Sequence, residues 1–236
     1  FITPCRPEVR QLAQPIIEIK NLIKKFGDRT VLDGVHAVIP EGKITVIMGG
    51  SGCGKSTLLR HLIGLHRPTS GEVWVDGKNI AGLDEPGMND VRKKFGMLFQ
   101  GSALFNSMTV GENVAVPLKE HTDLSPEIIR IIVRVKLELV GLTGFENFMP
   151  HEISGGMKKR VALARAIALD PKIVFYDEPG AGLDPITASM IDRLILDLSK
   201  KLSITSVVVT HEMKSAFRIA DQIIILQKGK VLQVGT

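Results

Sequence analysis

The sequence has little of what stabilises disulfide-rich proteins, crosses membranes or binds nucleic acid. Its 236 residues include 2 cysteines, Cys5 and Cys53. Two cysteines make no disulfide framework, and we expect a reducing, cytosolic compartment. No window approaches roughly eighteen consecutive apolar residues, so no membrane-spanning segment is predicted, and no signal peptide is visible. One Trp, one Tyr and no aromatic residues interleaved with basic ones give no sign of nucleic-acid binding.

Charge and length set looser limits. The formal net charge is +5, which an ordinary solvated basic face explains better than attraction to phosphates or to an anionic membrane surface. The length suits one large α/β domain. Residues 1–15 contain three prolines and no clear periodicity, so we expect an irregular N-terminal arm before a single domain over residues 16–236. Phe1 is not an initiator methionine, and we expect a trimmed start.

The most informative segment is the loop at residues 49–56, Gly-Gly-Ser-Gly-Cys-Gly-Lys-Ser. It fits the phosphate-binding loop pattern, in which two glycines bracket four residues before Lys-Ser. An apolar run at residues 44–48 reads as a buried strand, and residues 57–63 read as a helix. An ordinary glycine-rich turn is the alternative, but the strand before the loop and the helix after it favour a nucleoside triphosphate site.

The residue types explain how such a loop works. Glycines let the backbone wrap a phosphate chain with its N–H groups pointing inward, and the following helix adds unpaired N–H groups and a positive dipole end. Lys55 can reach the β- and γ-phosphates. The Ser56 hydroxyl can ligate Mg²⁺.

The remaining pattern predicts an α/β fold with two kinds of sheet. Short β-rich segments at residues 16–20, 31–40 and 72–76 predict an antiparallel layer. Continuous apolar segments predict further strands that alternate with helices in a mostly parallel sheet. Those segments are residues 94–99, 173–177, 205–210 and 222–226.

Residues 101–169 change character and predict a helical subdomain inserted into this core. Ser125 and Pro126 start a helix, because a capping hydroxyl precedes a proline in the first turn. Its buried face is predicted from spacings of three and four to consist of Ile128, Ile132, Val135, Leu139 and Leu142. A second helix is predicted at residues 156–169, and a later one at residues 187–202.

Two acids end the apolar strand at residues 173–177. In an enzyme with a phosphate-binding loop, the first acid, Asp177, fits the group that holds Mg²⁺ through its water shell. The next, Glu178, can polarise the attacking water. An ordinary polar strand end is the alternative, which the nearby phosphate-binding loop makes less favourable.

A second anion site is predicted at Ser154, Gly155 and Gly156, which open a helix rich in cations. Taken alone, Ser154 is equally well an N-cap residue. Two phosphate sites in one chain make sense if the nucleotide is sandwiched between two subunits, each of which supplies one site. The predicted assembly is therefore a head-to-tail homodimer.

These motifs and their order resemble the nucleotide-binding subunit of an ABC transporter, over residues 16–236. The resemblance implies a P-loop NTPase (RecA-like) core and hydrolysis of ATP with Mg²⁺. It also implies roles for the matching residues. The nucleotide contacts would be Phe26, Gly49, Gly50, Ser51, Gly52, Cys53, Gly54, Lys55, Ser56, Thr57, Gln100, Ser154, Gly155, Gly156, Asp184 and His211.

Within this resemblance, Gln100, Glu178 and His211 would be catalytic, and Ser56, Gln100 and Asp177 would hold the metal. Phe26 would stack on adenine; a half-buried aromatic at a strand edge is the alternative. Asp184 would lie in the loop that crosses the dimer interface; a cap for the helix that follows is the alternative, and the two roles are compatible. Gln100 would also face the membrane subunit.

One departure narrows the resemblance. In the ABC family, the motif that matches residues 154–157 commonly ends in Gln. This chain has Met157 there, and a thioether cannot replace the hydrogen bonds of an amide. Met at this place resembles the Mla/Mce-associated branch, which serves phospholipid transport, as do residues 99–105 and 109–114. The implied partners are a second copy of the chain, a membrane permease, an MCE-type lipid-binding protein and a small cytosolic accessory protein.

The implied location is the cytoplasmic face of the inner membrane. Relatives often continue beyond the position of Thr236, so the resemblance leaves open whether a C-terminal extension follows it. An importer or exporter of another substrate is the main alternative. A small-molecule kinase has no reason for the second phosphate site. A chromosome-maintenance ATPase would carry a long coiled coil between the two sites, and none is visible. A non-hydrolysing subunit would lack Lys55 or Glu178.

Overall fold

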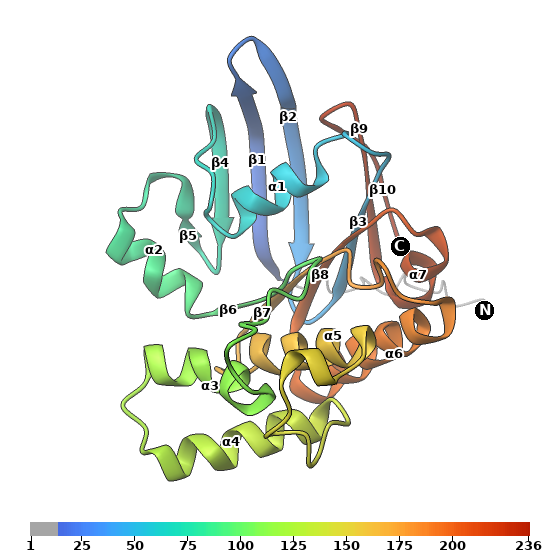
Figure 1. Cartoon of the computed structure of the whole chain (residues 1–236). Helices are drawn as coiled ribbons and strands as arrows, with labels where there is room; N and C mark the ends of the chain where they lie inside the picture. Colours follow the sequence, from blue (N-terminus) through green and yellow to red (C-terminus); the bar gives the residue numbers. More distant parts are fainter. Residues whose placement is uncertain (1–13) are drawn as a thin grey trace, which may run out of the picture.

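The computed structural model describes residues 14–236, in which a parallel sheet lies between an antiparallel sheet and a layer of helices (Figure 1). The predicted irregular arm lies outside these residues up to position 13, and Pro15 already opens the first strand. The larger sheet has the order β10-β9-β3-β8-β7-β6. Its strands are β3 (Ile44–Met48), β6 (Phe95–Leu98), β7 (Ile173–Asp177), β8 (Thr205–Thr210), β9 (Gln222–Gln227) and β10 (Lys230–Gly235).

The parallel pairings place chemistry-bearing strand ends side by side. Strand β3 pairs in parallel with β8 on one side, where Val46 lies opposite Val208, and with β9 on the other, where it lies opposite Ile223. Both faces of the sheet are buried, because successive side chains alternate between two separate apolar clusters. Val46 packs toward the helical layer and Ile47 toward the antiparallel sheet. The predicted parallel sheet is confirmed, and only β10 runs antiparallel.

The predicted antiparallel layer is also confirmed, with longer strands than expected. Its order is β2-β1-β4-β5, and every pairing within it is antiparallel. The strands are β1 (Pro15–Phe26), β2 (Arg29–Pro40), β4 (Ser70–Val75) and β5 (Lys78–Asn79). Helix α1 (Lys55–Leu62) packs between this layer and the parallel sheet, since Leu58, Leu59 and Leu62 are fully or almost fully buried in the shared cluster.

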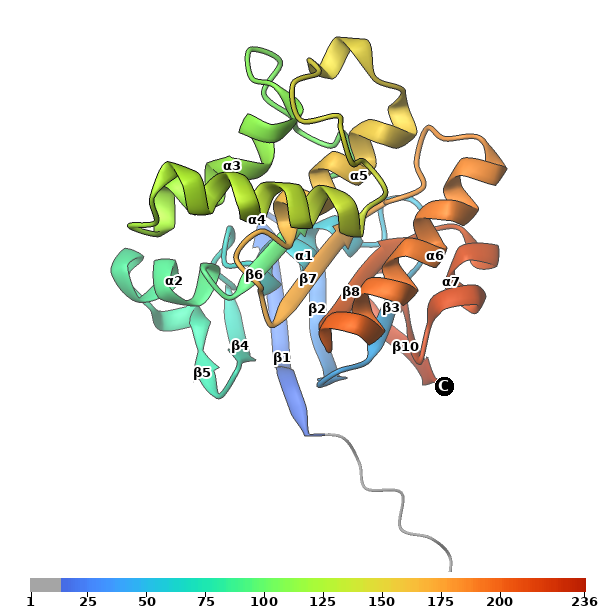
Figure 2. The same ribbon diagram turned by 90° about the horizontal axis from the view of Figure 1, so that it is seen from below.

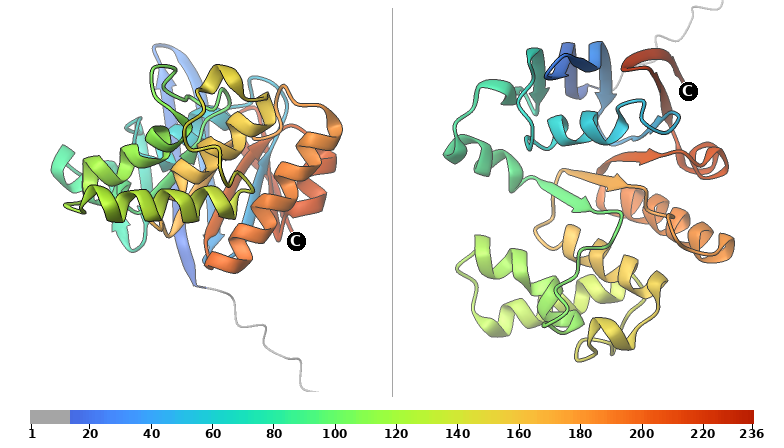
Figure 3. Two further views of the ribbon diagram at one scale, coloured as in Figure 1. Left: turned by 60° about the horizontal axis from the view of Figure 1, so that its bottom comes forward. Right: turned by 45° about the horizontal axis from the view of Figure 1, so that its top comes forward.

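The helical subdomain lies on the other side of the parallel sheet, as the right-hand view of Figure 3 shows. It contains α3 (Val110–His121), α4 (Pro126–Leu139) and α5 (Gly155–Ala166), which contact one another. Figure 2 shows α5 between the sheet and the outer pair α3 and α4. Helix α6 (Pro185–Leu202) lies beside this group.

The predicted buried face of α4 is wrong for two of its five residues, since Ile128 and Val135 are 45% and 48% exposed. Ile132 and Leu139 are partly buried against the core, and the most deeply buried apolar side chains of the helix are Ile129, Val133 and Leu137. Apolar residues cover a wide arc of the helix, so spacing alone could not define the edges of the buried face. Leu142, beyond its end, is buried as predicted.

Three helices lie outside the sequence-based predictions: α2 (Glu85–Arg92), α3 and α7 (Met213–Ile219). Helix α3 did have a signal, because Thr109 and Glu112 form a capping box in which each side chain accepts the other's backbone N–H. Among the helices of residues 14–236, none has the length and apolar character needed to cross a bilayer.

Candidate functional site

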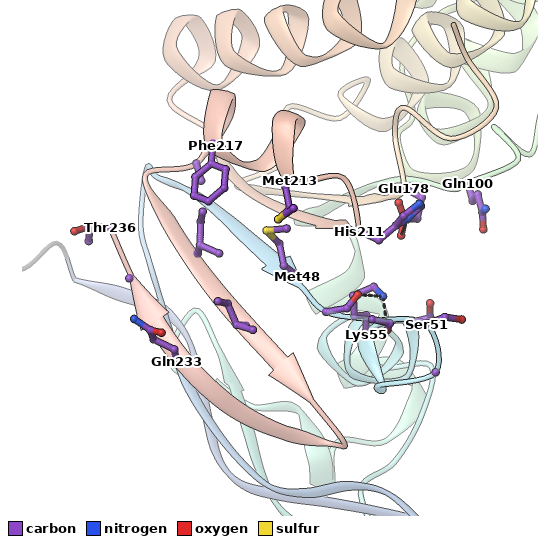
Figure 4. A pocket seen from close by; sticks show the side chains of 18 residues that line it. Met48, Ser51, Lys55, Gln100, Glu178, His211, Met213, Phe217, Gln233 and Thr236 are labelled. Atoms are coloured by element: carbon purple, nitrogen blue, oxygen red, sulfur yellow. Dashed lines mark hydrogen bonds and ion pairs between the residues drawn. The ribbon is translucent and has the colours of Figure 1, made fainter. Parts of the chain in front are cut away.

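A cavity of about 1130 Å³ opens at the ends of the central parallel strands (Figure 4). Parallel α/β sheets bind ligands in this position, because loops from several strand ends meet there. The cavity brings together many of the sequence-predicted site residues. They are Gly49, Gly50, Ser51, Gly52, Lys55, Ser56, Gln100, Glu178 and His211.

The phosphate-binding loop needs glycine at its two ends for different reasons. A Cβ atom at Gly49 would lie 2.2 Å from the carbonyl oxygen of Leu226, so only glycine allows the loop to leave β3 beside β9. Gly54 has a φ of 108°, which side-chain-bearing residues rarely adopt, and it serves as the N-cap of α1. The loop is also held from below, since the Gly229 N–H donates to the Cys53 carbonyl at 3.0 Å.

Lys55 occupies the centre of this loop. Its Nζ donates to the carbonyl oxygens of Gly49 and Gly50, at 2.7 and 3.1 Å (Figure 4). The side chain is largely buried, with 9% of the residue exposed. Backbone carbonyls thus satisfy a buried ammonium that also faces the cavity, where a phosphate oxygen would be a stronger, charge-assisted acceptor.

Glu178 and His211 come from neighbouring strand ends and meet at the cavity wall (Figure 4). One oxygen of the Glu178 carboxylate lies 2.9 Å from His211 Nδ1, and the other accepts a hydrogen bond from Thr210 Oγ1 at 3.2 Å. The Glu178 backbone has a φ of 47°, in the left-handed region that costs free energy for a residue other than glycine. With this backbone conformation at the end of β7, the Glu178 carboxylate faces His211.

Asp177 does not line the cavity, although its neighbour Glu178 does. Burial is the main reason why the pKa of its carboxyl is raised, and the neighbouring Glu178 charge raises it further. Nearby cations, Arg60 and Lys159 first among them, oppose this. The predicted metal ligands, a carboxylate, the Ser56 hydroxyl and the Gln100 amide oxygen, would all be oxygen donors. Such a set fits Mg²⁺, which takes few protein ligands and completes its shell with water and phosphate.

The second predicted phosphate site does not line this cavity. Ser154 and Gly155 are exposed at the start of α5, where the Ser154 hydroxyl accepts from the Met157 N–H at 3.2 Å. Gly156 is buried against Thr187 of α6. Ser154 is therefore an N-cap residue, which confirms the alternative prediction for it. It is also exposed to solvent on the surface.

The other predicted nucleotide contacts that do not line the cavity are Cys53, Gly54 and Thr57, which belong to the phosphate-binding loop and the first turn of α1, and Phe26 and Asp184. Asp184 caps α6, because its carboxylate accepts from the Ile186 and Thr187 N–H groups at 3.0 Å each. These hydrogen bonds, chiefly those to Thr187, lower the pKa of Asp184. Phe26 is 48% exposed, with its ring edge-on to His66, and its adenine-stacking role remains a prediction.

Part of the cavity was not predicted. Its far end is apolar and lies under α7, whose Met213 and Phe217 point toward it (Figure 4). Both side chains are strongly exposed, at 65% and 74%. They are four residues apart on a helix, a spacing that places them on one face. Because α7 has only seven residues, this pattern is too short to stand out in the sequence.

Comparison with known proteins agrees with this geometry. The family described as "ABC transporter" matches residues 32–181. A relative from Haemophilus influenzae, named intermembrane phospholipid transport system ATP-binding protein MlaF, is 48% identical over 94% of this chain and 84% of its own length. A Mycobacterium leprae relative, named probable ribonucleotide transport ATP-binding protein mkl, is 43% identical over 93% of this chain and 63% of its own.

Solved structures give the same result for the fold. A dimeric ATP-binding cassette in a post-hydrolysis state, bound to ADP and Pi, superposes with a TM-score of 0.85 at 36% identity. The match covers 93% of this chain and 98% of the cassette. The architecture described above is therefore that of ATP-binding cassettes, including the helical insert beside the parallel sheet.

Proposed function

Because the chain belongs to the ABC transporter family and is an ATPase, we propose that its hydrolysis of ATP drives phospholipid movement through a membrane permease. The cavity that joins the phosphate-binding loop to Glu178 and His211 carries the hydrolytic part of this proposal. The substrate class rests on the phospholipid transport named for the MlaF relative. Met157 and the segments at residues 99–105 and 109–114 support the same branch.

Transport of a different substrate is the second candidate. The mycobacterial relative is named for probable ribonucleotide transport, and its sequence identity to this chain is nearly as high as that of the MlaF relative. The chain itself has no contact with cargo in this mechanism, so its own residues cannot distinguish the two substrates. Lipid analysis of the assembled transporter can.

In the proposed mechanism, the polar groups of the cavity hold the phosphates and activate the attacking water. The loop N–H groups and Lys55 hold the β- and γ-phosphates in place. The Glu178 carboxylate accepts a hydrogen bond from the attacking water and draws its proton away as the new P–O bond forms. The bond to the ADP oxygen breaks in line with it. His211 and Thr210 fix the carboxylate in the orientation that this task requires.

The metal would be held by Ser56, Gln100 and Asp177. When bound, Mg²⁺ would supply positive charge that offsets the charge of the phosphate oxygens. It would also offset the repulsion between Asp177 and Glu178, which adds to the effect of burial in raising the pKa of Asp177.

A second copy of the chain completes the site in this proposal. Ser154, Gly155 and Gly156 open α5 at the surface, where an N-terminal helix dipole and backbone N–H groups favour an anion. Because these residues do not line their own chain's cavity, the phosphate they bind would be on the partner subunit. Asp184 would cross the same interface while it also caps α6.

Membrane partners would contact the helical subdomain. A groove of about 500 Å³ lies between β6 and α3, and its lining includes Phe99, Phe105 and Pro117. Such an exposed aromatic surface beside the Gln100 loop is suited to a protein partner. We propose that the permease docks there, at the cytoplasmic face of the inner membrane. An MCE-type lipid-binding protein and a small cytosolic accessory protein would complete the complex.

The hydrolytic assignment is tested with Glu178→Gln. We expect the variant to bind ATP, to lose turnover by about 10²- to 10⁴-fold, and to elute as a trapped dimer in gel filtration with ATP. Glu138→Gln is a matched control, because Glu138 is exposed on α4 far from the cavity lining. Normal turnover in Glu178→Gln would remove Glu178 as the group that polarises water.

The substrate is tested by purifying the chain with its membrane partners from native membranes. Extraction should yield phospholipid bound to the complex in amounts above those of a mock purification. Co-purification of a complex that carries nucleotides, peptides or amino acids, with no enriched phospholipid, would overturn the lipid assignment and leave the ATPase assignment intact.

A further inference from the structure

One buried cation has no part in the ATP-binding motifs. Lys159, in the second turn of α5, is 4% exposed. Its ammonium donates a hydrogen bond to the backbone carbonyl of Gln100. Burial lowers the pKa of Lys159, while the charges of Asp177 and Glu178 raise it, so this side chain lies near both acids of the site. Lysine side chains are rarely fully buried unless their ammonium group is paired with another group of the protein.

The loop that Lys159 holds has a strained backbone. Ser102 and Ala103 are consecutive residues in the left-handed region, with φ of 62° and 49°, and neither is glycine. Such conformations persist only where the surroundings fix them. Arg165, also on α5, donates to the carbonyls of Ser102 and Ala103 at 2.8 Å each. Two cations of one helix therefore fix residues 100–103 from end to end.

Helix α5 is also in direct contact with the strand that leads into this loop. A Cβ atom at Gly96 of β6 would lie 2.3 Å from the Ala166 carbonyl oxygen, so the two backbones touch. Residues 100–103, β6 and α5 thus form one packed unit. A displacement of α5 along its axis would move the Gln100 carbonyl, and with it the Gln100 side chain that lines the cavity.

The start of the same helix is the surface that would bind the partner subunit's ATP. Gly155 and Lys159 are four residues apart, so one helical turn separates the two functions. We propose that Lys159 is a positioning residue for hydrolysis, which links the seating of α5 on one nucleotide to the placement of Gln100 at the other. This inference rests on the proposed ATP-sandwich dimer and deepens it by giving the two sites a physical connection.

The test compares steady-state ATPase kinetics of the full chain and three variants. Lys159→Met removes the charge and the donor but keeps an unbranched side chain. Loss of a hydrogen bond from a charged donor corresponds to roughly tenfold in rate, so we expect kcat to fall by about tenfold while KM for ATP stays within about twofold. Lys159→Gln keeps an N–H donor and should retain more of kcat. Lys119→Met, at an exposed position of α3 outside the cavity lining, should leave kcat unchanged.

A double-mutant cycle with Gln100→Ala separates positioning from general stability. If Lys159 acts through Gln100, adding Lys159→Met to Gln100→Ala should cause little further loss of kcat. A purely structural role would instead give multiplicative losses and a matching drop in the folded fraction measured by circular dichroism. That result, or wild-type kcat in Lys159→Met, would overturn the inference.

Two controls keep the outcome readable. If Lys159→Met fails to fold, Lys159→Gln and its combination with Gln100→Ala supply the same cycle. Wild-type kcat in these Lys159 variants, alongside an ATP-trapped Glu178→Gln dimer, would overturn the positioning role alone. A Glu178→Gln chain that turns over normally and stays monomeric with ATP would overturn the proposed site itself.

Discussion

Helices α1 and α5 both begin where phosphate is expected, but they present their first turns in different ways. The start of α1 follows a buried strand, has glycine as its N-cap and carries a largely buried lysine that faces a cavity. The start of α5 is exposed and is capped by its own Ser154 hydroxyl. One end is built into a pocket, whereas the other is offered on the surface.

The difference teaches how a site can be divided between two molecules. A phosphate held only at α1 would gain a lysine and several N–H groups from one chain. A phosphate held only at α5 would remain largely in water, where charge interactions are weak. The start of α5 contributes more to phosphate binding when the nucleotide is already bound by the partner subunit opposite it. Under the proposed function, we therefore expect dimerisation to follow ATP binding.

The largest expected effect comes from breaking each end separately. Lys55→Met should weaken ATP binding by about a hundredfold or more, because it removes a charged donor to phosphate. The thermal unfolding temperature should then no longer rise when ATP is added. Gly155→Asp places a carboxylate where the partner's phosphate would lie and should abolish turnover. An acid in the first turn favours the helix itself, so its unfolding temperature should hold or rise.

Mixing these two variants tests the division directly. A heterodimer of Lys55→Met and Gly155→Asp has one site with both defects and one site with neither. A one-to-one mixture should therefore regain about a quarter of wild-type turnover if the sites work independently. No recovery on mixing, with both variants folded and able to exchange subunits, would contradict a site shared between chains.

A smaller effect is expected where the α5 end is anchored. A Cβ atom at Gly156 would lie 2.5 Å from Thr187 Cγ2, so Gly156→Ala should cost about 1–3 kcal/mol of unfolding free energy in urea denaturation. Thr187→Ser removes that methyl group, and the double variant should recover most of the loss. Equal stability of Gly156→Ala and the wild type would show that α5 and α6 separate easily.

The smallest effect is expected remote from both helix ends. Hydrogen bonds from Lys94, at 2.6 Å, and from Lys172 lower the pKa of Asp76, so its ionised form stabilises the folded chain. This contribution is present above the pKa of the unfolded state, about 3.9, and disappears as pH falls through the lower folded-state value. Asp76→Asn should cost about 0.2–1 kcal/mol near pH 7 and leave kcat unchanged.

The pH dependence is its own control. Urea unfolding of the two proteins should converge as the solution is acidified below about pH 3.9. A difference that persists at low pH would indicate a backbone effect, since residue 76 has a φ of 48°. Asn tolerates that region as well as Asp does, which makes it the suitable replacement.

The strands beside the chemistry were predictable almost to the residue. Continuous apolar runs at β3, β7 and β8 are bounded by polar or glycine residues, and nothing in them competes with a buried strand. The edges of the buried face of α4 were not predictable, because apolar residues cover a wide arc of the helix and tertiary contacts select which of them are buried. Buried Lys136, paired with Asp170, lies on the side that packs inward.

The candidate site divides in the same way. Motif spacing predicted the residues at strand ends, and those predictions lie together at one cavity. The contacts of Lys159 and Arg165 with residues 100–103 could not be predicted, since they depend on left-handed backbone at Ser102 and Ala103, neither of which is glycine. The roles assigned to Phe26 and Asp184 remain predictions for the assembled dimer.

The pairing of β3 has a consequence for how the protein is made. The strand that presents the phosphate-binding loop pairs with β8 and β9, and Gly229 holds Cys53 from behind. All of these partners are translated long after the loop itself. Long-range parallel pairing is slow to form, and N-terminal segments leave the ribosome first. A growing chain therefore carries an unfinished phosphate-binding loop until β8, β9 and Gly229 have emerged, and we expect it to engage ATP only after that point.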